Sequence, residues 1–319
     1  MPLGAVLVKE IGASRTLLIS GIVFSLAVFL SSFAKSLFSF LFCYSFLLGS
    51  GIGIGYTAPM TAGWKWLPES KGLISGAILT GFGTGGFIFN LVGTRFVNPE
   101  GIDPVDGKFP PQIYFGFPGM LRKLAVIYGA LCVLGSMLIT EPRPSGKRET
   151  ASVPGVEIVE AIKTPQFYLI WLMIFTCASA GLNVASVYKQ FAAVKPALAG
   201  HALHFELILY DGMELGDGFQ SLVGGMGALF NGLGRLFWGV TSDRIGFKRS
   251  FIILSAVQSV LHTFYPMSAN SKASFLIMHS LCHVCLAGCF ALMPPAIQKI
   301  FGPKNGALIY GLVYSAFGM

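Results

Sequence analysis

The chain has 319 residues, of which 54% are hydrophobic and only 11% charged, and its mean hydropathy is +0.70. Ordinary soluble domains carry about 25% charged residues, so a water-soluble globular domain is excluded. The net charge of +8 is spread between apolar runs and forms no contiguous basic face, which argues against nucleic-acid binding. The composition predicts an all-α polytopic membrane protein, integral and multi-pass, in a plasma or an organelle membrane.

Apolar runs along the chain predict the transmembrane helices. A helix needs about 20 mostly apolar residues to cross the hydrocarbon core, and lipid leaves backbone groups no partner outside a helix or a closed barrel. The predicted spans are residues 16–33, 37–62, 72–97, 121–140, 167–187, 218–240, 251–266 and 273–297, with a ninth that begins near 306 and is cut off at Met319.

The loops between these spans differ in charge. One set of loops, which includes segment 242–249, carries 13 of the 22 basic residues. The other set carries eight and includes the two long loops at 98–120 and 188–217. Because positive charge marks the cytoplasmic side, we predict that the first set faces the cytosol.

All six cysteines lie inside apolar runs and are interpreted as buried, reduced thiols. The stretch "CHVCLAGC" (282–289) lacks the residue order of a haem attachment site and a second pair of zinc ligands, so no metal is expected. His262, His279 and His283 lie in or beside spans, where hydrogen-bonded core histidines are commoner than proton-coupling ones. Neither an enzyme nor a cofactor is expected.

Glycines are frequent inside the predicted spans. The stretch "GFGTGG" (81–86) matches the spacing of a dinucleotide fingerprint, but that fingerprint requires a preceding strand, and here a membrane helix is expected. Small residues let membrane helices approach closely. The predicted helix-packing positions are therefore Gly76, Gly81, Gly83 and Gly86.

The chain matches itself at a separation of 234–235 residues. Residues 59–83 align with 294–318, and Ile11–Gly12 pairs with Ile245–Gly246, each pair following a charged residue and preceding a span. Parallel halves of this kind are typical of a large class of secondary transporters. The repeat predicts an N-terminal bundle (1–140), a cytosolic linker (141–166) and a C-terminal bundle (167–319). About nine of twelve helices are present, as in a chain truncated at both ends or a genuine short paralogue.

The stretch "GRLFWGVTSDRIGFKR" (234–249) resembles the cytosolic loop signature of the major facilitator superfamily. With "WLPESKG" and "YGLVYSAFG", it is most similar to the oxalate/formate antiporter and monocarboxylate porter branch. The resemblance implies a two-bundle fold that carries small organic anions across the lipid bilayer by alternating access, with coupled protons or a counter-anion. The alternative is a non-transporting protein, either a truncated paralogue or a receptor-like one.

A conformational latch is predicted in the charged loop. Asp243 can accept hydrogen bonds from backbone amides, pair with Arg244 or Lys248, and meet the dipole of a neighbouring helix. The first copy departs from the pattern, with Lys9–Glu10 where the family has an acid followed by a base. The loop could also be merely a solvated, positive-inside loop. The predicted latch residues are Gly239, Asp243, Arg244, Gly246, Lys248, Arg249, Gly12 and Arg15.

Arg235 is the candidate substrate-binding residue. It precedes Asp243 by eight residues, about 12 Å of helix, and a charge below the membrane surface indicates function. In the resembled branch an arginine of this helix binds the substrate carboxylate; snorkelling to the interface is the alternative. Asn231, one turn earlier, is a second candidate contact. Oxalate carriers of the family are expected to add a lysine in the helix that here reads "ALIYGLVYSAFGM". Its absence favours a monocarboxylate such as formate, lactate or pyruvate, and makes oxalate less fitting.

Overall fold

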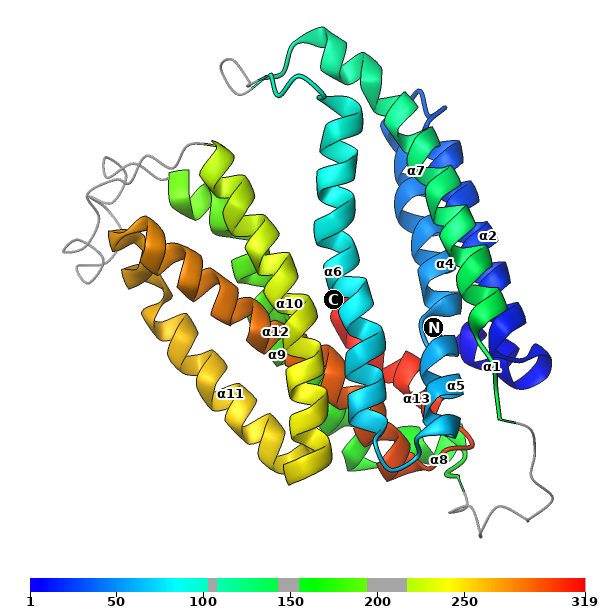
Figure 1. Cartoon of the computed structure of the whole chain (residues 1–319). Coiled ribbons are helices and arrows are strands. Elements are labelled where there is room, and N and C mark those ends of the chain that lie inside the picture. The colour runs from blue at the N-terminus through cyan, green and yellow to red at the C-terminus, as the bar shows by residue number, and fades with distance from the viewer. Residues whose placement is uncertain (103–107, 143–154, 194–216, 319) are drawn as a thin grey trace. The chain divides into compact units, whose positions relative to one another are not determined.

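The computed structural model describes residues 1–102, 108–142, 155–193 and 217–318, and almost all of them are helical (Figure 1). The elements before the cytosolic linker are α1 (Pro2–Ile11), α2 (Ala13–Ser31), α3 (Leu37–Leu41), the π-helix η1 (Phe42–Leu47), α4 (Leu48–Gly55), α5 (Ala58–Trp66), α6 (Lys71–Val97) and α7 (Pro111–Leu138). Those that follow are α8 (Ile158–Lys163), α9 (Pro165–Ala193), α10 (Asp217–Ile245), α11 (Phe247–Phe264), the 3₁₀ helix η3 (Tyr265–Asn270), α12 (Lys272–Phe301), α13 (Gly306–Val313) and the 3₁₀ helix η4 (Tyr314–Gly318).

Seven helical segments of the described part of the chain are long and apolar enough to cross a membrane. They are Ala13–Ser31, Leu37–Trp66, Lys71–Val97, Pro111–Leu138, Pro165–Lys189, Phe247–Ser268 and Lys272–Phe301. The prediction of a polytopic helical protein is confirmed. The expected span 218–240 is helical as α10 but more polar than these seven, and Gly306–Gly318 forms a shorter apolar helix. The total of nine spans stays a prediction.

Two boundaries differ from the predicted ones. α7 begins at Pro111, ten residues before the expected span, because a proline suits the first turn of a helix, where its missing N–H would have no helical partner. The linker, expected at 141–166, contains the short helix α8 near its end, while its residues 143–154 lie outside the described part of the chain.

The helices pack into two compact units, and each contains segments that lie apart in the sequence. The predicted division into bundles 1–140 and 167–319 stays a prediction. The first unit contains residues 1–68, 88–162 and 297–312, and the second contains 69–87, 163–296 and 313–319. The first half of α6 therefore belongs with the second unit, and the end of α12 with most of α13 belongs with the first.

The first unit is built around α2, which packs against α4 and α7. Ser20 donates a hydrogen bond of 2.8 Å to the carbonyl oxygen of Gly51 across the α2–α4 contact. A Cβ at Gly21 would lie 2.3 Å from the Cβ of Cys132, so only glycine permits α2 to lie this close to α7. Small residues thus set the helix spacing here, as is usual in membranes.

The second unit buries most of α12 among its neighbours. Trp238 of α10, Leu254 of α11 and Leu292 of α12 belong to one buried cluster. Cys177 of α9 and Cys289 of α12 join the same cluster and form a disulfide, which corrects the expectation of a reduced thiol at both positions. Close packing brings their Cα atoms to 6.4 Å, within the range that a disulfide requires.

The two copies of the repeat share a backbone conformation at the start of a helix. Gly12, before α2, has φ 85° and ψ 165°, and Gly246, before α11, has φ 84° and ψ 158°. Both glycines have a positive φ, a backbone conformation that is strained for residues with a side chain. Thr16 and Ser250, four residues later, donate their hydroxyls to the carbonyls of these glycines. The alignment of Gly12 with Gly246 is therefore matched in three dimensions.

Candidate functional site

Arg235 lies on α10, inside the second unit, and is only 4% exposed. Its Nε donates to Asn231 Oδ1 at 3.2 Å, and its Nη1 donates to the carbonyl oxygen of Leu79 on α6 at 3.2 Å. The guanidinium carbon also lies 5.2 Å from the ring centroid of Phe82 and 4.7 Å from that of Phe290. This arrangement is a buried cation held between two aromatic rings, and it is not that of an arginine snorkelling toward water.

Asn231 connects this arginine to α12. Its Oδ1 accepts from Arg235, and its Nδ2 donates to the carbonyl oxygen of His283 at 3.3 Å. Trp238, further along α10, donates its indole N–H to the next carbonyl oxygen of α12, that of Val284, at 3.0 Å. Two side chains of α10 thus satisfy consecutive carbonyls of α12, and one of them, Asn231, also binds Arg235.

The first half of α6 packs closely on α10 through glycines. A Cβ at Gly76 would lie 2.5 Å from the carbonyl oxygen of Arg235, and one at Gly83 would lie 2.5 Å from the Cα of Gly232. Thr80 donates to the carbonyl oxygen of Gly232 at 2.8 Å. Gly81 and Gly86 do not share this packing, since a Cβ on either would meet open space among the described residues. Neighbouring residues of a helix point in different directions, so only part of the glycine run faces α10.

Asp243 binds the start of α6. Its Oδ1 accepts from the backbone N–H of Gly72 at 2.9 Å, and its Oδ2 accepts from that of Leu73 at 2.7 Å. These amides belong to the first turn of α6, where N–H groups lack helical partners and the dipole favours negative charge. The amide partners expected for Asp243 are thus present, while in the described part of the chain no ion pair joins it to Arg244 or Lys248.

The other predicted latch residues lie around this contact. Gly239 permits the approach of α6, because a Cβ there would lie 2.2 Å from the carbonyl oxygen of Gly72. Gly246 supplies the positive-φ turn between α10 and α11 described above. The side chains of Arg244, Lys248 and Arg249, and that of Arg15 in the first copy, are exposed.

The first copy uses a different pair at the equivalent place. Lys9, which stands where the second copy has Asp243, donates to Asn305 Oδ1 at 3.0 Å. Asn305 immediately precedes α13, and its Nδ2 donates to the carbonyl oxygen of Val156 at 3.0 Å. A lysine cannot accept from helix amides, so an amide side chain lies between the base and the helix start.

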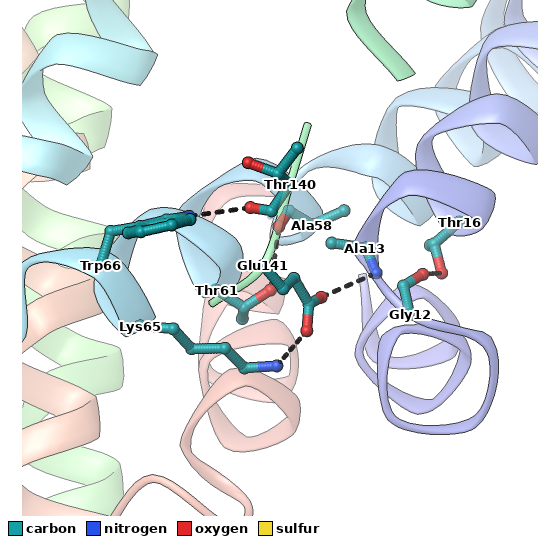
Figure 2. A network of polar contacts seen from close by, with 9 residues as sticks. All are labelled: Gly12, Ala13, Thr16, Ala58, Thr61, Lys65, Trp66, Thr140 and Glu141. Carbon is teal, nitrogen blue, oxygen red and sulfur yellow. Dashed lines mark hydrogen bonds and ion pairs between the residues drawn. The ribbon is translucent and has the colours of Figure 1, made fainter. Parts of the chain in front are cut away.

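A second polar network, which the sequence analysis did not single out, lies in the first unit (Figure 2). Glu141 forms an ion pair with Lys65 at the end of α5, and its Oε1 accepts from the backbone N–H of Ala13 at the start of α2 at 3.1 Å. Trp66 donates its indole N–H to the carbonyl oxygen of Thr140 at 2.9 Å. The hydrogen bond from Lys65 holds the pKa of Glu141 below its ordinary value. Glu141 is the first residue of the predicted cytosolic linker (141–166), for which no contacts were predicted.

The sequence matches a known protein family over almost its whole length. The family model of the Major Facilitator Superfamily matches residues 1–318. The chain belongs to this superfamily. It is an integral, multi-pass membrane protein, as its apolar helices indicate.

Three relatives illustrate the likeness. Apicoplast pyruvate carrier 1 of Toxoplasma gondii is 29% identical over 99% of this chain and 64% of its own length. The oxalate:formate antiporter of Oxalobacter formigenes is 26% identical over 85% of this chain and 57% of its own length. Monocarboxylate transporter 9 of Pongo abelii is 31% identical over 32% of this chain and 20% of its own length. The chain thus spans roughly three fifths of the length of the first two of these relatives.

Proposed function

We propose that the chain carries small monocarboxylates across a membrane by alternating access, with Arg235 binding the substrate carboxylate. The observation that carries the proposal is the buried, oriented guanidinium of Arg235. A cation in a membrane helix is expensive to bury and indicates a functional site. Membership of the superfamily and the printed names of the relatives support transport of organic anions.

The surroundings of Arg235 suit a carboxylate. Phe82 and Phe290 cover the guanidinium, while Asn231 and Leu79 fix its rotation. A guanidinium has five N–H donors in one plane, and two parallel donors match the two oxygens of a carboxylate. The low dielectric of the buried site strengthens such a pair. The geometry therefore favours an anionic ligand over a neutral one.

The absence of a second cation favours one carboxylate over two. The sequence 306–318, which forms α13 and η4, contains no lysine or arginine. In the resembled branch, carriers of oxalate are expected to provide a lysine there. Pyruvate, lactate and formate each need one such contact, and pyruvate and formate occur in the names of relatives. We infer a monocarboxylate substrate and a coupled ion or counter-anion.

Asp243 and the start of α6 supply the conformational element of this proposal. Alternating access requires contacts that form in one state and break in another. A carboxylate on two amides at a helix start is such a contact, since it can separate without leaving a charge buried: Asp243 is exposed. We assign it the latch, with Gly239 and Gly246 permitting the approach and the turn.

Equilibrium binding of radiolabelled pyruvate to the purified chain tests the role of Arg235. Arg235→Lys keeps the charge but loses the fork, so we expect pyruvate affinity to fall by about 10- to 100-fold, the equivalent of one charge-assisted hydrogen bond. Arg122→Lys is the matched control, because Arg122 also lies over a phenyl ring, that of Phe33, but is exposed and belongs to the first unit. Equal affinities for both variants and the parent chain would remove Arg235 from the site.

A further inference from the structure

Two histidines of α12 face each other inside the second unit. His279 and His283 are one turn apart, and the centroids of their rings are separated by 4.3 Å. His279 is 1% exposed, whereas His283 is only partly buried. The ring of Tyr188 on α9 lies 4.6 Å from that of His279.

The hydrogen bonds of the pair leave basic nitrogen atoms in the interior. His283 Nδ1 lies 2.9 Å from the carbonyl oxygen of His279, and since a carbonyl only accepts, Nδ1 carries the proton and Nε2 holds the lone pair. His279 Nδ1 lies 3.3 Å from the hydroxyl of Tyr265. His279 Nε2 is buried without a hydrogen-bond partner among the described residues. Buried polar atoms rarely lack partners, so this one requires an explanation.

The pair faces α10 at Gly227. A Cβ at Gly227 would lie 2.9 Å from His279 Nε2 and 3.1 Å from His283 Cε1, so both rings lie against bare backbone. The two imidazole rings approach the backbone of α10 at Gly227 so closely that no side chain fits between them and this helix. Asn231 and Arg235 lie one and two helical turns after Gly227, so all three residues are on the same face of α10.

Asn231 connects the histidine pair to Arg235. Its amide donates to the carbonyl oxygen of His283 and accepts from Arg235, so one side chain touches both groups. Gly227 and Arg235 are eight residues apart, about 12 Å along the helix. At an effective dielectric of ~20, a unit charge about 12 Å from a site changes the affinity of that site for a second unit charge by about tenfold.

We propose that His279 and His283 form a proton-binding site coupled to the carboxylate at Arg235, so that one proton travels with each monocarboxylate. The inference rests on the proposed function for its coupling, though not for the proton site itself. A hydronium ion gives its proton to an imidazole lone pair, so one O–H bond breaks, one N–H bond forms and a water molecule is released. The pair takes one proton, because two imidazolium ions in contact repel each other.

The sign of the coupling follows from charge. With no ligand, the cation of Arg235 disfavours a second positive charge on the pair. A bound carboxylate neutralises Arg235, so proton binding becomes more favourable, and by reciprocity protonation raises carboxylate affinity. The titratable groups around the pair are Tyr188 on α9, Tyr265 at the start of η3, Cys282 and Cys285 on α12, and Arg235 on α10. No acidic side chain is among these neighbours in the part of the chain that the structure describes.

The pair is better suited to a proton than to a metal ion. No group of three or more histidine, cysteine, aspartate or glutamate side chains within the described residues could hold a metal. A transition metal needs such a set for a stable site, whereas a proton needs a single lone pair.

The first experiment counts protons on the unliganded protein. Difference acid–base titration in detergent compares the parent chain with the double variant His279→Asn/His283→Asn, because asparagine keeps a polar atom near each Nδ1 but cannot hold the proton. We expect the parent chain to bind one proton more than the double variant between pH 4 and pH 8. A difference of zero, or of two independent protons, overturns the site. If the double variant does not fold, His283→Asn alone, on the partly exposed ring, should shift the midpoint of the one-proton step, because the remaining imidazole no longer shares the proton. An unchanged midpoint overturns the site.

The second experiment tests the coupling with pyruvate as the probe. A pH-indicator dye in weak buffer reports proton uptake when pyruvate is added at a pH above the midpoint of the titration. We expect uptake by the parent chain, none by the double variant, and about tenfold weaker pyruvate binding by the latter at acid pH. Gly227→Ala retains both histidines but displaces their rings, so its uptake should fall. Unchanged uptake in the double variant overturns the proposal.

His262→Asn is the control for this second experiment. His262 lies on α11, where its ring nitrogens face the carbonyl oxygens of Gln258 and Ala180 at 2.8 and 2.9 Å, outside the pair. Its variant should take up protons with pyruvate like the parent chain. If the parent chain binds no pyruvate, the proposed function fails, while the proton count still decides whether the pair binds a proton.

Discussion

Replacement of Asp243 by asparagine separates the charge of the latch from its shape. In the native loop both carboxylate oxygens accept from amides of the first turn of α6, at 2.9 Å from Gly72 and 2.7 Å from Leu73. Asparagine can preserve one of these bonds through its carbonyl oxygen. Its NH₂ group then faces the other amide, donor against donor, and the negative charge at the helix start is lost.

The size of the effect follows from these two contacts. A hydrogen bond to a charged group contributes about 1.5–3 kcal/mol, and a charge at a helix terminus about 0.3–1 kcal/mol. Asp243 is exposed, so water competes for the carboxylate and the lower end of the range applies. We expect Asp243→Asn to weaken the loop–helix contact by about 1.5 kcal/mol, which is roughly a tenfold shift toward the separated state.

Hydrogen–deuterium exchange measures this shift directly. The amides of Gly72 and Leu73 exchange when the contact opens, so a peptide covering the start of α6 should exchange about tenfold faster in Asp243→Asn. Lys248→Gln is the control, because it alters the loop charge without touching these amides. Equal exchange in Asp243→Asn and the parent chain would refute the reasoning. Equal acceleration in both variants would show that loop charge in general, and not this contact, sets the equilibrium.

The remaining predictions concern packing and pH. Gly76→Ala places a Cβ against the carbonyl oxygen of Arg235, so thermal denaturation should show a free energy of unfolding lower by about 1–3 kcal/mol. Gly81→Ala is the control, because its Cβ would meet open space among the described residues. Its midpoint of thermal denaturation should be unchanged or higher. The pKa of Glu141 is depressed in the folded state, so its ion pair with Lys65 stabilises the folded protein at pH values above the ordinary carboxyl pKa of about 4.3. This stabilisation is lost as the pH falls through the lower pKa of the folded state. The melting temperature of Glu141→Gln should therefore lie below that of the parent chain at pH 7, by an amount equivalent to under about 1 kcal/mol, and the gap should narrow as the pH falls below about 4.3. A gap that does not change with pH contradicts this assignment.

The features that the sequence predicted well are those with a short-range cause. Length and hydropathy decide which segments form membrane helices, so the spans before the linker were found with errors of a few residues at their ends, apart from the start of α7, which lies ten residues before the predicted one. The repeat aligned Gly12 with Gly246, and both glycines have the same positive-φ conformation before a helix, because such a turn is a local requirement. The place of Arg235 on α10, about 12 Å before the charged loop, follows from the eight residues that separate it from Asp243, while its role in the site stays a prediction.

The features that were missed depend on packing between distant segments. Nothing local in the sequence pairs Cys177 with Cys289, since the bond depends on how α9 lies against α12. Glu141 looked like one charge of a linker, and only the fold brings it to Ala13 and Lys65. Which glycines of α6 face α10 depends on the rotation of that helix, which a glycine-rich and almost uniformly apolar segment does not reveal.

Counterflow of labelled pyruvate tests the central claim most directly. The purified chain is reconstituted into vesicles loaded with unlabelled pyruvate, and external labelled pyruvate is added at low concentration. The account predicts a transient accumulation of label, which Arg235→Lys reduces by tenfold or more and Arg122→Lys leaves intact. Label no higher than in protein-free vesicles, with the helical circular dichroism of the chain preserved, would contradict the account.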